Sequence, residues 1–213
     1  MKESTLKEKV LKAIRHAQVE ADYPKKAMDI DTKSSIYPDM DEFPELYFAK
    51  QLEKAGGRFI YCKDGYDLII NLKLLITNHQ YETIYTNDPD VEHFLTENSI
   101  NFVNFEQGLR TASAAITQCE CLVARFGTVV MSSRLPAGRK TYTLPKTHIV
   151  IAFKDQLISE LSSVFPFLQN NYGKDMPSMI TYITGPSRTA AMQGELVYGI
   201  NGAANLFVLY VDV

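Results

Sequence analysis

Within residues 183–190 a glycine–proline break is followed by two hydroxyl side chains and an arginine, a set of groups suited to binding an anion. An apolar run typical of a β-strand precedes it and a segment of helical character follows. We therefore expect a strand-to-helix turn whose backbone N–H groups face a ligand. Ser187 and Thr189 add hydroxyl groups, and Arg188 adds a planar cation that suits a carboxylate or a phosphate. An ordinary capped turn explains the bare pattern equally well.

A second glycine pair, Gly199 and Gly202, encloses Asn201 shortly afterwards. Glycine is common where a helix ends, so this pair predicts the end of the short helix and a turn of the chain. The apolar residues 205–211 then form the predicted last strand.

Three blocks of sequence, in the same order, resemble the LUD-domain family, the lactate-utilization protein C-like proteins. In residues 116–130 an apolar strand runs into Gly127-Thr128, as it does into the Thr-Gly-Thr/Ser turn of the family. Residues 144–151, Leu-Pro-Lys-Thr-His-Ile-Val-Ile, are similar to Leu-Pro-x-x-His-Ile-Val-Val. The third block covers residues 180–211. The resemblance covers the C-terminal half of the chain well and the N-terminal half only by pattern.

This resemblance implies a NagB/RpiA/CoA-transferase-like fold, which is a three-layer α/β fold with a mostly parallel sheet. In such sheets ligands lie outside the carboxyl ends of the strands, where we expect the turns after Gly127 and Gly185, and the one near Met131, to meet. The expected ligand-binding residues are Gly127, Thr128, Gly185, Ser187, Arg188, Thr189 and Asn201.

The departures from the family pattern concern groups that ionise. Ala191-Met192-Gln193 stands where the family has Asp-Ile-Glu, Asn201 replaces a histidine, and Arg125 replaces a glutamate. Losing acid–base groups at a catalytic site costs about 10²–10⁴-fold in rate. The pattern therefore indicates that binding is kept and chemistry is altered or lost, with Arg125 making the pocket more cationic.

Glu120 and His148 are the remaining candidates for proton transfer. Glu120 lies in the predicted strand between Cys119 and Cys121, which should share one face, so its side chain points to the other face, towards solvent or a ligand. His148 begins a buried strand and is expected to be a core histidine rather than a catalytic one. Two further arginines, at positions 134 and 139, could add positive charge to the site.

The composition excludes several classes of protein. A net charge of −3 without a basic cluster argues against nucleic-acid binding and against attraction to anionic membranes. No signal-peptide pattern begins the chain and no apolar stretch is long enough to span a bilayer, so we expect a cytoplasmic protein. The three cysteines match neither a disulfide framework nor a metal site nor an iron–sulfur motif. We expect no metal and no cofactor in this chain.

The chain divides into an N-terminal helix and arm, residues 1–40, and a LUD-like α/β domain, residues 41–213. The first helix should begin at Thr5, and residues 22–41 read as a loop. Helices are then expected over residues 42–55, 66–80, 89–97 and 156–168, with strands over residues 58–62, 83–86, 101–105, 148–153 and two around Gly127.

Two functions from different classes fit these residues. The first is an accessory subunit of lactate-to-pyruvate oxidation that binds a small anionic organic acid, or a phosphate-bearing ligand, and docks on iron–sulfur partner proteins, as the resemblance implies. The second is a free-standing enzyme acting on a phosphosugar, folate or acyl-CoA compound. That enzyme needs Glu120 or His148 in the same cleft as Arg188. A scaffold that binds no ligand is a third alternative.

Overall fold

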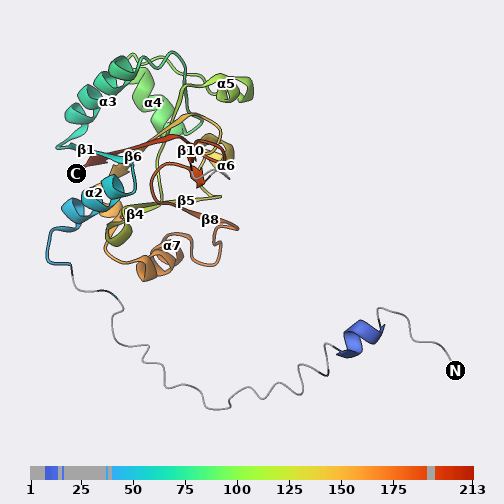
Figure 1. Cartoon of the computed structure of the whole chain (residues 1–213). Coiled ribbons are helices and arrows are strands. Elements are labelled where there is room, and N and C mark those ends of the chain that lie inside the picture. The colour runs from blue at the N-terminus through green and yellow to red at the C-terminus, as the bar shows by residue number, and fades with distance from the viewer. Residues whose placement is uncertain (1–7, 14–15, 17–36, 38–39, 191–194) are drawn as a thin grey trace. The chain divides into compact units, whose positions relative to one another are not determined.

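The structure is a computed structural model that describes residues 8–13, 16, 37, 40–190 and 195–213 (Figure 1). They belong to two compact units, within residues 1–39 and 40–213, and each unit is described by itself. In the first unit residues 8–13 form a helix on which Val10 and Leu11 are exposed. The expected start of this helix at Thr5 and nearly all of the loop over residues 22–41 lie outside the described residues.

A five-stranded sheet in which every neighbouring pair of strands is parallel forms the centre of the second unit. Its strands, in spatial order, are β1 (Arg58–Cys62), β11 (Asn205–Val211), β6 (Thr147–Phe153), β3 (Ala114–Thr117) and β2 (Ile84–Tyr85). The central strands β11 and β6 are almost continuously apolar because both of their faces are covered, as is usual in parallel sheets.

Helices α3 (Gly65–His79) and α4 (Pro89–Glu97) cover one face of this sheet (Figure 1). Leu72 of α3 and Leu95 of α4 are fully buried against Ile149 and Leu209 of the strands. The Asp88 carboxylate caps α4 by accepting a hydrogen bond of 3.2 Å from the amide of Asp90, as its Asp-Pro-Asp sequence predicts.

The other face is covered by α2 (Pro44–Lys54) and by a second, smaller sheet. The order of its strands is β7 (Leu157–Ile158), β4 (Cys121–Val123), β5 (Thr128–Ser132) and β8 (Ile180–Ile183). Phe48 and Leu52 of α2 are buried between the two sheets, and α7 (Val164–Tyr172) packs on the outer side of the small sheet. The predicted three-layer α/β arrangement with a mostly parallel sheet is thereby confirmed, with the second sheet as part of the third layer.

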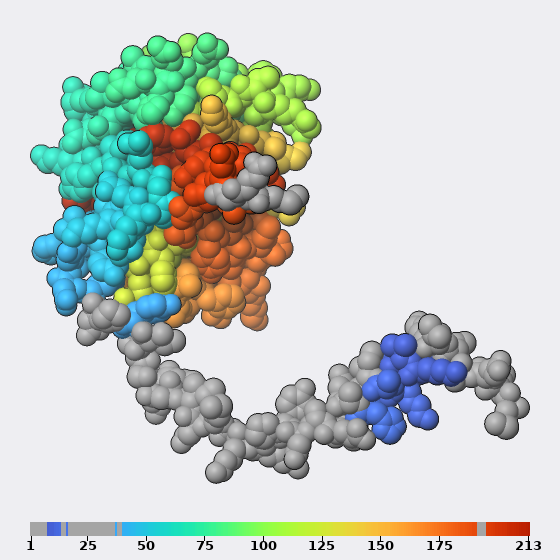
Figure 2. All heavy atoms as spheres, in the orientation of Figure 1, coloured from blue at the N-terminus to red at the C-terminus, as the bar shows by residue number. Residues whose placement is uncertain are grey.

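The turn after Gly185 leads into a β-hairpin and not into the expected helix. Strands β9 (Arg188–Ala190) and β10 (Leu196–Tyr198) are antiparallel, pair only with each other among the strands that the structure describes, and are exposed. The hairpin residues lie at the surface of the unit, shown in orange-red in Figure 2. The prediction failed because each strand of the hairpin has only three residues, which is too short for the hydrophobic pattern to distinguish a two-stranded ribbon from a helical turn.

Three other local predictions were wrong. Residues 101–105 form only one isolated bridge, between Val103 and Tyr85. The helix expected over residues 156–168 is replaced by short helical turns η2 (Lys154–Gln156) and η3 (Leu161–Ser163), by β7, and by the later start of α7. Cys119 packs between the two sheets whereas Cys121 packs towards α7, because Cys119 precedes the regular strand and strict alternation does not reach it.

The remaining elements are short. They are α5 (Glu106–Thr111), α6 (Gly138–Thr141) and the single turn η1 (Ala124–Phe126) between β4 and β5. Gly127 ends η1 with a φ of +60°, a left-handed conformation that glycine adopts without strain. The predicted pair of strands around Gly127 is thus confirmed.

Two glycine turns pack directly on the backbone of α2. A Cβ atom on Gly127 would overlap the amide nitrogen of Leu52 and lie 2.6 Å from the carbonyl carbon of Gln51. A Cβ atom on Gly185, whose φ is +79°, would overlap the carbonyl oxygen of Ala55. Neither neighbour can move aside, because both are main-chain atoms.

We expect Gly127→Ala to lower the free energy of unfolding by about 1–3 kcal/mol more than Gly138→Ala. Gly138 is the matched control because its φ is +64° and a Cβ atom there would meet nothing within 4 Å. Both variants incur the left-handed backbone cost of about 1–2 kcal/mol, and only Gly127→Ala adds the overlap with α2. Urea unfolding of the two variants measures the difference, and equal losses would contradict the close packing of this turn.

Candidate functional site

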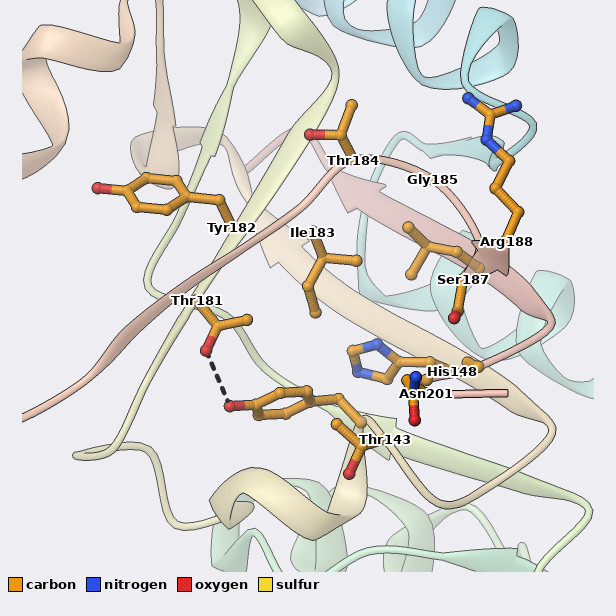
Figure 3. Close-up of a pocket in the computed structure, with 14 residues that line it drawn as sticks. Thr143, His148, Thr181, Tyr182, Ile183, Thr184, Gly185, Ser187, Arg188 and Asn201 are labelled. Atoms are coloured by element: carbon orange, nitrogen blue, oxygen red, sulfur yellow. Dashed lines mark hydrogen bonds between the residues drawn. The ribbon is translucent and has the colours of Figure 1, made fainter. Parts of the chain in front are cut away.

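A cavity of about 310 Å³ opens between the two sheets, at the amino-terminal ends of β6 and β11 (Figure 3). His148 is the second residue of β6 and Leu206 is the second residue of β11. The cavity thus lies at the edge of the parallel sheet opposite to the carboxyl ends. The residues that line it are Tyr142, Thr143, His148, Thr181, Tyr182, Ile183, Thr184, Gly185, Ser187, Arg188, Asn201, Gly202, Ala203 and Leu206.

Strand β8 forms one wall of this cavity. Its residues alternate, so Thr181 and Ile183 point towards the interior while Tyr182 points away (Figure 3). The hydroxyls of Tyr142 and Thr181 lie 3.2 Å apart and close the lower end of the wall. These side chains present hydroxyl groups on an otherwise apolar surface.

The turn after β8 and the loop before β11 form the opposite side. The amide of Ser187 donates to the carbonyl of Ala203 (2.8 Å), and the amide of Gly199 donates to the carbonyl of Ser187 (2.9 Å). The Ser187 amide is therefore committed to the protein and is not a donor for a ligand. The Ser187 side chain instead points towards His148 and Asn201, so three polar groups converge on the floor (Figure 3).

Arg188 lies at the rim of the cavity. It begins the exposed hairpin strand β9, and its guanidinium extends away from His148 and Asn201 (Figure 3). In the part of the chain that the structure describes, it has no carboxylate within 4 Å. No aspartate or glutamate is among the lining residues, so the charge of this cavity is set by one arginine.

His148 is buried and uncharged. Its Nε2 atom lies 2.9 Å from the hydroxyl of Thr117 on the neighbouring strand. Burial lowers the pKa of the imidazole to about 3, so at neutral pH it offers a neutral ring with one donor and one acceptor nitrogen. The expectation of a core histidine describes its burial, but the ring also lines the cavity.

Glu120 does not point to solvent, and it does not line this cavity. Its carboxylate is buried and accepts hydrogen bonds from the hydroxyls of Ser132 and Tyr172, the latter at 2.9 Å. Burial and this carboxylate raise the pKa of Tyr172 to about 12. Glu120 thus ties the small sheet to α7. The alternating pattern failed here for the same reason as at Cys119: the chain is irregular before β4.

The other predicted residues divide into two groups. Thr128 lies behind the cavity wall, where its hydroxyl is 2.7 Å from that of Thr184. Gly127 packs on α2, and Thr189 is exposed in the hairpin opposite Val197. The structure thus brings to one cavity only these predicted residues: Gly185, Ser187, Arg188, Asn201 and His148.

Arg125 does not make the cavity more cationic. It is buried and its Nε atom donates to both carboxylate oxygens of Glu160, at 2.8 and 2.7 Å. This pairing lowers the pKa of Glu160. Arg134 pairs with Asp175, and Arg139 lines a separate hollow. The sequence shows these cations but not their partners, which are distant along the chain.

Sequence reasoning missed Tyr142, Thr143 and Thr181. The first two directly precede the Leu144-Pro145 turn that leads into β6, and Thr181 lies on the strand that leads into Gly185. Their place beside two of the family-like blocks was the available signal.

Within residues 8–13, 16, 37, 40–190 and 195–213, no three His, Cys, Asp or Glu side chains cluster as a metal site would require. Among the same residues, none of the helices has the length and apolar character needed to cross a bilayer.

The fold and the cavity define an α/β protein with a parallel central sheet, an accessory antiparallel sheet and a polar cleft between them. The LUD domain model matches residues 46–211, so the chain belongs to the LUD-domain family. A crystal structure of a DUF162 family protein from Deinococcus radiodurans superposes with a TM-score of 0.59 over 79% of this chain and 96% of the other, at 14% sequence identity. That likeness supports the fold.

Curated relatives carry one name. The chain is 37% identical over 103 residues to lactate utilization protein C of Bacillus subtilis, and 37% identical over 93 residues to lactate utilization protein C of Geobacillus thermodenitrificans. These matches cover 47% and 43% of this chain and 43% and 39% of the relatives. The matched region therefore spans less than half the length of those relatives.

We expect the buried neutral His148 to make stability depend on pH. Its pKa is depressed in the folded protein, so below about pH 6.5 the unfolded chain takes up a proton that the folded state does not. Stability should fall as the pH falls, by about 2 kcal/mol between pH 7 and 5. Urea unfolding at both pH values should show this loss in the wild type and not in His148→Gln. His93→Gln, at an exposed position on α4, is the control that should behave like the wild type. Identical pH dependence in His148→Gln and the wild type would contradict this assignment.

Proposed function

We propose that this LUD-domain protein serves lactate utilization by binding a small anionic organic acid in the cavity between its two sheets. The charge of the cavity carries the proposal: the lining residues contribute Arg188 and no carboxylate. Hydroxyl and amide groups of Ser187, Asn201 and Thr181 suit the oxygens of a hydroxy acid or a keto acid. The names of the curated relatives point to the same substrate class.

The neutral imidazole favours binding over proton transfer. A general base works best with a pKa near the operating pH, and the pKa of His148 is several units below it. The ring is instead suited to exchange a neutral hydrogen bond with a ligand. Glu120 is engaged by Ser132 and Tyr172 outside the cavity. Of the two groups considered for catalysis, only His148 lies in the same cleft as Arg188.

In this proposal the chain is an accessory subunit. It holds the acid, and iron–sulfur partner proteins in the cytoplasm carry the electrons removed when lactate becomes pyruvate. The names of the curated relatives support a role in lactate utilization. The iron–sulfur partners are part of the proposal.

A second candidate is a free-standing enzyme of the NagB/RpiA/CoA-transferase-like type, acting on a phosphosugar, folate or acyl-CoA compound. The observation in its favour is that His148 lines the cavity that Arg188 borders. In such an enzyme His148 would orient the substrate through a hydrogen bond, because its lowered pKa leaves it weakly basic.

We expect lactate or pyruvate to raise the melting temperature of the protein. A ligand at 100 times its dissociation constant stabilises by about 2.7 kcal/mol, or roughly 5–10 °C for a domain of this size. The shift should disappear in Arg188→Ala and persist in Arg110→Ala, which removes an exposed arginine from α5 outside the cavity lining. Thermal unfolding with lactate, pyruvate, sugar phosphates, nucleotides, folates and acyl-CoA compounds tests both candidates.

The outcomes separate the two functions. A shift with sugar phosphates, folates or acyl-CoA compounds alone would favour the free-standing enzyme. No shift with any of these compounds would refute ligand binding at this cavity for all the classes tested.

A further inference from the structure

A second hollow adjoins the cavity between the sheets. Its volume is about 680 Å³, it is more open, and the two hollows share Thr143 as a lining residue. It lies over α6 and the start of α5. The residues that line it are Tyr85, Asn87, Glu106, Leu109, Ala137, Gly138, Arg139, Lys140, Thr141 and Thr143.

Two cations border this second hollow. Arg139 is exposed, and its guanidinium contacts the sulfur of Met179 at 3.8 Å. Within the described part of the chain it has no carboxylate within 4 Å. Lys140 pairs with Glu106 at 2.6 Å, but about two thirds of each side chain is exposed. An exposed ion pair of this kind is weak, so an incoming anion can compete with Glu106 for the lysine.

Hydrogen bonds to the main chain hold two polar side chains in the inner part of the hollow. Asn87 donates to the carbonyl of Pro136 at 3.0 Å, which fixes its side chain at the edge. Thr141 donates to the carbonyl of Ala137, and buried Tyr85 and Leu109 form an apolar floor. Cationic groups at the rim over an apolar floor suit a ligand whose anionic end lies outermost.

Thr143 marks the boundary between the two hollows. Its hydroxyl donates to the carbonyl of Arg139 at 2.9 Å and points away from His148 (Figure 3). Arg188 lies at the far rim of the first cavity, on the side opposite Thr143 (Figure 3). Arg188 thus borders the first cavity, Arg139 and Lys140 border the second hollow, and Thr143 lines both.

We propose that the physiological ligand is elongated, with a carboxylate near Arg188 and a phosphate near Arg139 and Lys140, and that it spans both hollows. This inference rests on the proposed binding of an acid in the first cavity and extends it to a larger substrate class. A free acid of the size of lactate occupies only part of the first cavity, whose volume is about 310 Å³. A phosphate is assigned to the second hollow because an arginine and a lysine together match its charge and its several oxygens.

The test uses the full chain and ω-phosphonocarboxylates whose methylene spacer lengthens one carbon at a time, measured by calorimetry. Linking two groups that bind adjoining sites raises affinity strongly at the spacer length that matches their separation, and much less at shorter lengths. We expect the phosphonocarboxylate with the matching spacer to bind at least about tenfold more tightly than lactate, inorganic phosphate or the monocarboxylate of equal length.

Substitutions assign the two ends of the ligand. Arg139→Ala should reduce the affinity for the best phosphonocarboxylate to that of the matching monocarboxylate, and should leave lactate binding unchanged. Arg188→Ala should weaken the binding of lactate and of the phosphonocarboxylate. Lys73→Ala, which removes an exposed cation of α3 that lines neither hollow, should leave the binding of both unchanged. Glu106→Gln should raise the affinity for the phosphonocarboxylate by roughly two- to fivefold, because it removes the carboxylate that pairs with Lys140.

Three outcomes would overturn the inference. If lactate binds through Arg188 but no spacer improves on it, the acid site stands and the elongated ligand is refuted. If Arg139→Ala weakens the binding of phosphonocarboxylates and Arg188→Ala does not, these compounds bind in the second hollow alone. The single spanning ligand is then refuted. If none of the compounds binds, both the acid site in the first cavity and the elongated ligand are refuted.

Discussion

The contact of the α2 backbone with two glycine turns is the constraint on which the cavity depends. Gly127 lies between β4 and β5, and Gly185 lies in the turn after β8, so α2 and its C-terminal residue Ala55 contact both the small sheet and the cavity wall. Main-chain atoms meet main-chain atoms there, and no side chain can be inserted. The hydrogen bond between Thr128 and Thr184 joins the same two turns from the side, at 2.7 Å. The space between the sheets is therefore defined by backbone geometry, and side chains only line it.

Much of the fold could be predicted from the sequence because its strongest signals are local. The predicted strand at residues 58–62 coincides with β1, and the capped start of α4 at Asp88 is correct. The hairpin at Arg188 could not be predicted, because strands of three residues are too short to show a period and the same residues fit a ribbon or a helical turn. Of the candidate site, Ser187, Arg188 and Asn201 share the cavity, whereas the carboxylate of Glu120 is held by Tyr172, 52 residues further along the chain. Pairings over such distances leave no local mark.

The cavity combines one cation with neutral polar groups, and burial is the reason. The ring of His148 is too deeply enclosed to take up a second proton, so it contributes a hydrogen-bonding surface without charge. Arg125, which follows the small-sheet strand β4, is paired with Glu160. Among the described residues that line the cavity, positive charge comes from Arg188 at the exposed rim. In the proposed function, this rim cation attracts an anion from solvent and the neutral polar groups select its shape.

The hairpin that carries Arg188 has strand partners only within itself, among the strands that the structure describes. It is joined to the rest of the unit at its base, where Ser187 bonds to Ala203. Substitutions, or changes of length, in such an element leave the parallel sheet and its core untouched. The sequence of the hairpin at the rim can thus diverge among homologous chains while selection for stability preserves the sequence of the core. In the proposed function, ligand preference is therefore an evolvable property of this hairpin, separable from the stability of the core.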